Sequence, residues 1–285
     1  MKVLIAGASG YIGRALTGRL LELGHQVTGL SRDPQRAAKR LPDGVQVHPW
    51  DPLSTVDLRV FDGVDVVITV MGEPALGWWT AQKKRRMYES RVNATKALVS
   101  GMAQCSPGPK VFISGSAVGF YGNRQNELLD EASGPGDDFL SRLTSDWESE
   151  ALEASSNGMR VVTVRTGLVV GRGSPFIRTQ TPLYRMGLGA RLGNGNQWWP
   201  WVHLDDVVGV FLHALTQQDL EGPLNATSPK PIQQKDFSAA LGAVLSRPTV
   251  LRVPKVAIRL LLGEMSTEIL TSKRVLPNRV IDDGY

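Results

Sequence analysis

The sequence predicts an α/β protein built on a doubly wound parallel sheet. Short, wholly apolar runs, typical of buried parallel strands, recur along the first half of the chain. Helical patterns separate these runs, and strands that alternate with helices form parallel sheets with helices on both faces. The first apolar run leads through three glycines into a helix, which is a typical beginning for this fold.

Six strands are expected in the main sheet, three for each half of the fold. In chain order they are Val3–Ala6, His25–Leu30, Val45–His48, Val64–Val70, Lys110–Ser114 and Arg160–Arg165. The main helices between them are expected at Pro34–Leu41, Thr80–Gln104 and Asp137–Ser156, with a first helix that opens at Ile12.

The pattern loosens after Gly171, where Gly, Arg and Asn become frequent. We expect a main domain of residues 1–171, to which 201–216 return, and a small C-terminal α/β domain on the substrate side, made of 172–200 and 217–285. Its expected elements are helices at Pro182–Met186, Lys235–Leu245, Val256–Leu262 and Thr267–Leu270 and strands at Leu224–Ala226 and Val250–Val253. A turn precedes Tyr285, so a further segment is expected after it.

Composition excludes several classes of protein. The 285 residues are 42% hydrophobic, enough for a substantial core, but no window is apolar enough for a membrane span, and no signal peptide is evident. Cys105 is the only cysteine, which favours a reducing, cytoplasmic location. The net charge of +5 suits an anionic small molecule, whereas no basic stripe with stacking aromatics predicts nucleic acid binding. The four histidines are scattered, so no metal site is expected.

The glycine-rich loop predicts the kind of ligand. Gly7, Gly10 and Gly13 separate a buried strand from a helix, so that backbone N–H groups and the positive end of the helix dipole meet at one spot. That spot suits a pyrophosphate. The expected contacts of a dinucleotide are Gly7, Ser9, Gly10, Tyr11, Ile12 and Gly13.

The end of the second strand favours NADP over NAD. An acid at this position binds the ribose 2′-hydroxyl of NAD, whereas an arginine accommodates a 2′-phosphate. The chain has Ser31 and Arg32 there, and Asp33 can cap the next helix. The alternative is that Arg32 is an ordinary solvated arginine.

Further cofactor contacts are expected where other strands end. Asp51 could accept from the adenine amino group, or simply form a turn before Pro52. Gly72 would let the backbone approach the ligand closely. Arg91 could point back at phosphate, whereas the Lys83–Arg86 run is more simply a solvated helix face than a phosphate clamp. The full set of these expected contacts is Asp51, Val70, Met71, Gly72, Arg91 and Ser114.

Three residues are candidates for chemistry. Ser116 and Tyr121 follow the fifth strand and either take part in catalysis or only line the pocket. A tyrosine acts as an acid only if its pKa, ordinarily about 10, is lowered. His203 either carries a proton or makes a structural hydrogen bond at a helix start. It follows Trp198, Trp199 and Trp201, which are expected to wall a pocket, and Trp78–Trp79 either join that pocket or fill core.

These residues resemble the extended short-chain dehydrogenase/reductase superfamily. The glycine spacing at 7, 10 and 13, Tyr121-Gly122 and His203-Leu-Asp205-Asp206 match its landmarks. Within it, the chain is similar to the atypical epimerase-family proteins of the NAD-dependent epimerase/dehydratase superfamily, which have relatives called SulA-like cell-division inhibitors. The most specific matching segments are 72–74, 90–92, 136–139, 146–148, 197–201 and 261–265. The resemblance implies a Rossmann-type domain, NADP binding and a small C-terminal domain.

The chain departs from the superfamily at its proton relay. The catalytic tyrosine and lysine lie four residues apart, and the matching pairs here are Leu140 with Thr144 or Phe139 with Leu143. Ser116 matches the catalytic serine. We therefore expect an NADP-dependent oxidoreductase or epimerase-like enzyme acting on an unknown small molecule, with Tyr121 or His203 as proton carrier. The rival hypothesis is a non-catalytic NADP-binding regulator with a protein partner, for instance in cell division. A homodimer is a further possibility.

Overall fold

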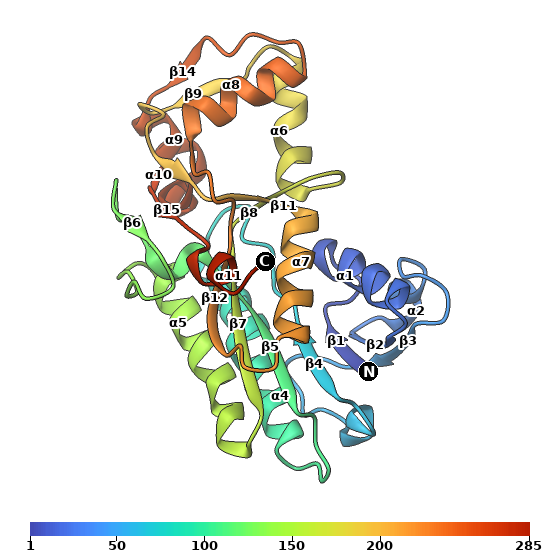
Figure 1. The fold of residues 1–285 in the computed structure, drawn as a ribbon. Coiled ribbons are helices and arrows are strands. Elements are labelled where there is room, and N and C mark those ends of the chain that lie inside the picture. Colours follow the sequence, from blue (N-terminus) through green and yellow to red (C-terminus); the bar gives the residue numbers. More distant parts are fainter.

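The centre of the molecule is a seven-stranded sheet in which every neighbouring pair is parallel. The computed structural model describes all residues from 1 to 285. The strand order is β3-β2-β1-β4-β5-β7-β12, so the winding reverses between β1 and β4 (Figure 1). This confirms the predicted fold class, and it places the ligand crevice at the carboxyl ends of β1 and β4. The strands are β1 (Lys2–Ala6), β2 (Gln26–Ser31), β3 (Gln46–Pro49), β4 (Val66–Thr69), β5 (Val111–Ala117), β7 (Arg160–Thr166) and β12 (Gly222–Ala226).

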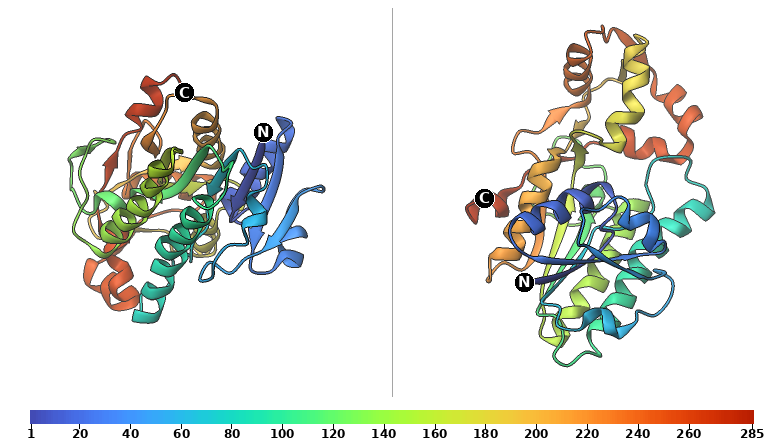
Figure 2. Two further views of the ribbon diagram at one scale, coloured as in Figure 1. Left: turned by 90° about the horizontal axis from the view of Figure 1, so that it is seen from below. Right: turned by 90° about the vertical axis from the view of Figure 1, so that its right-hand side faces the viewer.

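Helices cover both faces of the sheet, as Figure 2 shows. On one face α1 (Tyr11–Glu22) and α7 (Leu204–Thr216) bury apolar side chains such as Leu16 and Phe211 against the strands. On the other face α4 (Ala94–Met102) and α5 (Phe139–Leu152) do the same. Val3–Ala6 of β1 are completely buried between these layers, which explains the unbroken apolar run. None of the helices is both long and apolar enough to cross a bilayer.

A small domain projects beyond the carboxyl edge of the sheet, at the top of Figure 1. Its elements are α6 (Pro175–Arg185), β9 (Ala190–Leu192), α8 (Gln234–Val244), β14 (Leu251–Val253), α9 (Lys255–Leu262) and α10 (Ser266–Leu270). Short strand pairs form at the base of this domain and beside it: β8 (Leu168–Val170) with β11 (Trp201–His203), β10 (Trp198–Trp199) with β13 (Ile232–Gln233), and β6 (Leu128–Leu129) with β15 (Arg274–Val275).

The structure corrects the predicted domain boundary. Residues 222–226 form β12, which pairs with β7 and completes the main sheet instead of belonging to the small domain. The last fifteen residues also return to the main domain: β15 pairs with β6, and Arg279 of α11 (Asn278–Asp282) donates to the Pro223 carbonyl at 2.8 Å. These pairings join segments about fifty residues or more apart, and the local sequence pattern carries no signal for them.

Two helices differ from the prediction. The helix expected at Thr80–Gln104 is divided into α3 (Ala81–Tyr88) and α4 by a π-helical turn at Glu89–Asn93. Helix α6 begins at Pro175 rather than near Pro182, because Ser174 caps it through the Ile177 N–H at 3.3 Å and Pro175 suits the first turn.

Candidate functional site

The glycine-rich loop is held by backbone contacts that only glycine allows. Gly7 has φ +95°, and a Cβ there would lie 2.8 Å from the Met71 nitrogen. At Gly13 a Cβ would lie 2.1 Å from the Gly7 carbonyl oxygen. No side chain caps α1 and no acid lies in its first turn, so its N–H groups are free at the carboxyl edge of the sheet. The loop therefore offers the expected anion-binding cradle.

The end of β2 presents an unpaired arginine. Asp33 caps α2 (Pro34–Ala38) by accepting from the Arg36 N–H at 2.9 Å, and the Ser31 hydroxyl accepts from the Asp33 N–H at 3.2 Å. Arg32 is exposed and makes no hydrogen bond or ion pair. Its guanidinium is thus available to an anion beside the second strand, and no carboxylate competes for it.

The segment after β4 is clamped by the π-helical turn. Ser90 Oγ accepts from the Glu73 N–H at 2.8 Å, and Arg91 Nη1 donates to the Glu73 carbonyl at 3.0 Å. A Cβ at Gly72 would lie 2.6 Å from Arg91 Cζ. Gly72 makes room for Arg91, and Arg91 Nη1 binds backbone, so the predicted ligand contact of each residue stays a prediction. Burial lowers the pKa of Arg91 to about 10.

The basic run Lys83–Arg86 forms ion pairs on a helix face that is only partly solvated: Arg85 and Arg86 are exposed, as predicted, whereas Lys83 and Lys84 are partly buried. Lys83 and Arg86 pair with Glu73 at 2.9 and 3.4 Å, and Arg85 pairs with Glu89 at 2.6 Å. Lys84 pairs with Glu264 of the small domain at 2.7 Å. Each cation therefore has a carboxylate partner. Arg85 and Glu89 are four residues apart along the helix, whereas the partners of Lys83, Lys84 and Arg86 lie outside it and leave no local signal.

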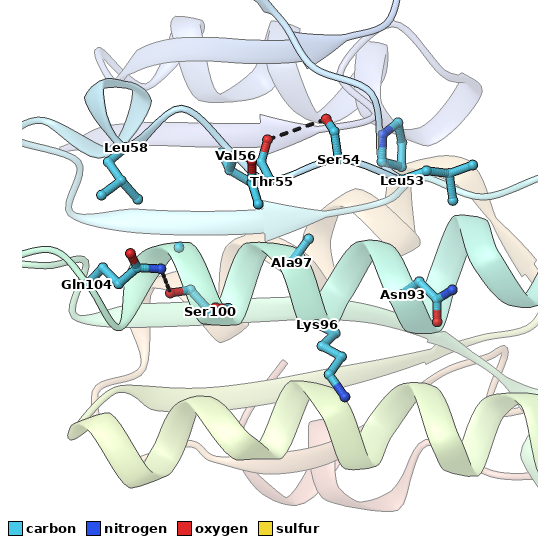
Figure 3. A pocket seen from close by; sticks show the side chains of 12 residues that line it. Leu53, Ser54, Thr55, Val56, Leu58, Asn93, Lys96, Ala97, Ser100 and Gln104 are labelled. Atoms are coloured by element: carbon cyan, nitrogen blue, oxygen red, sulfur yellow. Dashed lines mark hydrogen bonds between the residues drawn. The ribbon is translucent and has the colours of Figure 1, made fainter.

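Asp51 lies in a turn beside an open groove. It is exposed, and its Oδ1 accepts from the Leu53 N–H at 3.1 Å, which is the simpler of its two predicted roles. The groove runs between residues 52–58 and α4, with Leu53 and Asn93 at one end and Leu58 and Gln104 at the other (Figure 3). The other carboxylate oxygen of Asp51 has no hydrogen-bond partner and is free to accept from an adenine amino group. The adenine contact therefore stays a prediction.

Ser116 is part of a buried charge network. Its hydroxyl donates to Glu148 Oε1 at 2.6 Å, and Arg165 holds both Glu148 oxygens at 2.8 Å. The three residues are at most 7% exposed. Because the only proton of Ser116 is donated to a carboxylate paired with a guanidinium, Ser116 can only accept a hydrogen bond from a ligand. Ser114 does not reach the crevice with its side chain: it is fully buried, with Oγ 3.3 Å from Thr69 Oγ1.

Tyr121 lies inside the same network. Its hydroxyl donates to Asn225 Oδ1 at 2.7 Å and accepts from Arg165 Nη1 at 3.0 Å, and the residue is completely buried. Burial raises the pKa of Tyr121 to about 12, away from the value that an acid catalyst needs. In this conformation the hydroxyl has no access to a ligand, so the structure assigns Tyr121 to the fold rather than to the predicted chemistry.

The positions of the missing proton relay contain no replacement. Thr144 Oγ1 donates to the Leu140 carbonyl at 2.7 Å, within α5 itself. Leu140 packs near Gly119, where a Cβ would lie 3.2 Å from Leu140 Cβ. Neither residue offers a titratable group to a substrate.

His203 is the predicted catalytic residue that remains accessible. It caps α7, because its Nδ1 accepts from the Asp205 N–H at 3.3 Å. Where Nδ1 of the neutral ring accepts this bond, the proton is on Nε2, and the Asp205 carboxylate lies 3.4 Å from the same Nδ1. The Nε2 nitrogen lies beside Gly171 and the Tyr11 hydroxyl: a Cβ at Gly171 would be 3.2 Å from His203 Nε2 and 3.1 Å from Tyr11 Oη. The Tyr11 hydroxyl is buried without a hydrogen-bond partner, so the Gly171 backbone lies beside two polar side-chain atoms that are not hydrogen-bonded to each other.

The indole nitrogens of the three tryptophans bind three different segments. Trp198 donates to Asn126 Oδ1 at 3.0 Å, Trp199 to the Ile269 carbonyl at 3.3 Å and Trp201 to the Lys230 carbonyl at 3.2 Å. Each indole thus ties a different segment to the base of the small domain. Trp79 is buried against Phe139, whereas Trp78 is 62% exposed beside Gly263.

The sequence analysis missed Glu148 and Arg165. A signal was present: Arg165 follows the buried run Val161–Val164 near the end of β7, and a buried arginine requires an acidic partner. Glu148 lies in the middle of α5, one of whose faces is buried, but the pair spans seventeen residues and nothing local connects the two.

The doubly wound sheet, the glycine loop at its switch point and the serine at the end of β5 define a dinucleotide-binding protein of the short-chain dehydrogenase/reductase type. The model of the NAD dependent epimerase/dehydratase family matches residues 3–226, and the chain belongs to this family. Residues 253–285 match a domain of unknown function, DUF1731. The predicted resemblance is therefore confirmed.

Similar proteins cover nearly the whole chain. Epimerase family protein ML0860 of Mycobacterium leprae is 37% identical over 287 residues, which cover 99% of this chain and 90% of that protein. The human epimerase family protein SDR39U1, solved with NADPH, has 30% identity and a TM-score of 0.87, covering 100% of this chain and 94% of that one. A UDP-glucuronic acid 4-epimerase from Bacillus cereus, 18% identical with a TM-score of 0.78, shares the fold.

Proposed function

We propose that this protein binds NADP(H) and transfers a hydride to or from a small molecule held between the two domains. The observation that carries the nucleotide assignment is the unpaired Arg32 at the end of β2, where no acid is available for a ribose 2′-hydroxyl. The human relative solved with NADPH supports it. The other epimerases of similar fold include proteins solved with NAD, which makes the choice of nucleotide worth measuring.

The residues that fit the cofactor come from three strand ends. The free N–H groups at the start of α1 would hold the pyrophosphate, and the Arg32 guanidinium would hold the 2′-phosphate. The backbone of Val70 and Met71 borders the same crevice because it lies against Gly7. A bound NADPH supplies the hydride, and the chain supplies binding, orientation and a proton.

His203 is the proton carrier that we propose. Its Nε2 is the free ring nitrogen, and it lies at the carboxyl edge beside Gly171 and Tyr11. Ser116 would orient the ligand by accepting a hydrogen bond, since its own proton is donated to Glu148. Tyr121 takes no part.

The nucleotide assignment is tested by ligand-induced stabilisation. A ligand at a hundredfold excess over its Kd stabilises the folded state by about 2.7 kcal/mol. We expect NADPH to raise the melting temperature of the wild type more than NADH does, and Arg32→Ala to remove this preference. Arg40→Ala, a nearby exposed arginine, is the matched control and should keep it. Equal shifts for the two nucleotides in the wild type would overturn the assignment.

The catalytic assignment is tested at His203 with two variants. Turnover of NADPH with a panel of carbonyl compounds should be lost in both His203→Ala and His203→Asn. Asparagine keeps a side-chain oxygen for the α7 cap but carries no titratable proton, so it separates catalysis from helix capping. Full activity in His203→Asn would show that capping is the only role of His203.

A second candidate function is a non-catalytic NADP-binding regulator. Two observations favour it. Leu140 and Thr144 have no titratable side chain, and the Ser116 hydroxyl already donates its proton to Glu148. It predicts tight NADPH binding with no saturable oxidation of NADPH by any compound of the panel.

A further inference from the structure

The small domain carries the whole excess of positive charge. Residues 172–200 and 227–270 contain ten Lys and Arg residues but only three acidic ones, a net charge of +7. The chain as a whole has a net charge of +5, so the remaining residues sum to −2. Such an uneven distribution gives one end of the molecule a positive field that attracts anionic partners and repels cationic ones.

The same domain exposes aliphatic side chains out of proportion to its size. It holds about a quarter of the chain, yet it contributes nine of the nineteen large hydrophobic residues that are exposed. The nine are Leu183, Met186, Leu188, Val244, Val250, Leu251, Val256, Leu260 and Leu261. Single exposed hydrophobic residues are ordinary, but a concentration of them marks an interaction surface.

Four of the nine lie where α6 and α8 end. The two helix ends are adjacent, because Arg247 Nε donates to the Arg185 carbonyl at 2.9 Å and a Cβ at Gly189 would lie 3.0 Å from Thr249 Cγ2. Both ends lie at the tip of the small domain farthest from the sheet (Figure 1). Here Val244 and Val250 are each 81% exposed, and Met186 and Leu188 are 64% and 50% exposed.

Three exposed arginines belong to the same tip. Arg185 ends α6, Arg247 follows α8, and Arg252 lies in β14 directly after Val250 and Leu251. None of the three pairs with a carboxylate. We call the set Arg185, Met186, Leu188, Val244, Arg247, Val250 and Arg252 the distal surface.

We propose that the distal surface docks on an anionic lipid bilayer. Aliphatic side chains that enter the boundary between headgroups and acyl chains gain from apolar burial, and neighbouring arginines bind lipid phosphates. The charge asymmetry of the chain turns this end of the molecule toward a negative surface. The sequence-based expectation of no membrane contact rests on the lack of a spanning segment, which does not bear on docking from one side.

Two other occupants fit the surface less well. In a symmetric dimer formed through this surface the arginines of both copies would face each other, and like charges oppose such a contact. In contacts between proteins the binding energy concentrates at a few central residues, among which Trp and Tyr are enriched. The distal surface has no Trp or Tyr, and the grooves along α4 and between α1 and α7 lie in the main domain.

Flotation with lipid vesicles tests the proposal on the full chain. One set of vesicles is phosphatidylcholine alone, and the other contains about 30 mol% phosphatidylglycerol, in the range of a strongly anionic leaflet. We expect the protein to float with the anionic vesicles at low salt and to be released from them by about 0.5 M salt. It should not bind the neutral vesicles. No binding to anionic vesicles at low salt, or equal binding to both sets, would overturn the proposal.

Variants measure separately how much the arginines and the aliphatic side chains of the distal surface contribute to vesicle binding. Arg185→Glu/Arg252→Glu should weaken vesicle binding by roughly tenfold or more, since each basic residue near an anionic surface contributes severalfold. Val244→Ser/Val250→Ser should weaken it severalfold at constant charge. The matched controls in the main domain are Arg40→Glu/Lys110→Glu and Leu152→Ser, all at exposed positions. If the controls lose as much binding as the distal variants, the attraction is due to net charge alone and the proposal is wrong. Light scattering on the protein without vesicles detects a dimer, and a dimer that Arg185→Glu/Arg252→Glu dissociates would overturn the proposal.

Discussion

The glycine-rich loop and the cluster beneath Ser116 lie at the same edge of the sheet but are built in different ways. The loop consists of backbone brought close to backbone, with Gly13 against the Gly7 carbonyl within seven residues of chain. The cluster consists of side chains from three distant elements, in which Glu148 bridges Ser116 and Arg165. A site made by backbone leaves a mark in the local sequence, whereas a site made by distant side chains does not. The comparison also separates cofactor binding from catalysis. The loop that binds the cofactor is intact, whereas the tyrosine–lysine pair that usually transfers the proton is absent.

The largest expected effect comes from breaking the buried pair. Arg165→Met leaves the Glu148 carboxylate buried without its counter-charge, and such a change costs about 3–5 kcal/mol of the free energy of unfolding. Urea denaturation measures it. The double variant Glu148→Gln/Arg165→Met should recover most of the loss, because no unpaired charge remains. A single variant that costs less than about 1 kcal/mol would show that the pair is not closed in solution.

Gly13→Ala tests the backbone side of the comparison. The added Cβ would lie 2.1 Å from the Gly7 carbonyl oxygen, so the loop must shift. We expect a loss of stability of about 1–3 kcal/mol and weaker NADPH binding, measured by calorimetry. Gly18→Ala on the same helix is the matched control, since no atom lies within 4 Å of its Cβ position. It should stabilise the protein by about 0.5–1 kcal/mol and leave NADPH binding unchanged.

The same contrast explains which features could be predicted from the sequence. The sheet, its six predicted strands and the loop follow from apolar runs and glycine spacing, and the structure confirms them. The place of the predicted strand Leu224–Ala226 in the main sheet, the return of the last fifteen residues and the Lys84–Glu264 ion pair depend on contacts between distant segments. At the site, His203 as a helix cap and Asp33 as the cap of α2 were predicted alternatives that local geometry supports. The burial of Tyr121 and Ser114 was not predicted, because the sequence at a strand end does not show whether a hydroxyl faces the crevice or the core.

Tyr121→Phe tests whether the Tyr121 hydroxyl is structural or catalytic. The change removes the hydrogen bonds to Asn225 and from Arg165 inside the core, so we expect a loss of about 1–2 kcal/mol in urea denaturation. NADPH binding and any turnover should remain at the level of the wild type. Tyr88→Phe is the control, since its hydroxyl bonds Asp146 at the surface and its loss should cost less than about 0.5 kcal/mol. A large drop in turnover with normal stability would restore Tyr121 as a catalytic residue.

The smallest expected effect is a dependence of the free energy of unfolding on pH, which the cluster beneath Ser116 causes and the glycine-rich loop does not. Glu131 lies beside the cluster, where its oxygens accept from the N–H groups of Asn225 and Arg279, and burial raises the pKa of its carboxyl above the ordinary value of 4.5. Between pH 4.5 and that raised pKa the folded state binds more protons than the unfolded state, so the free energy of unfolding falls as the pH rises. Glu131→Gln carries no titrating group, and its curve should lack this fall. Urea denaturation of both proteins from pH 4 to 8 gives the difference, and parallel curves would mean that backbone hydrogen bonds fully offset the burial of the carboxylate.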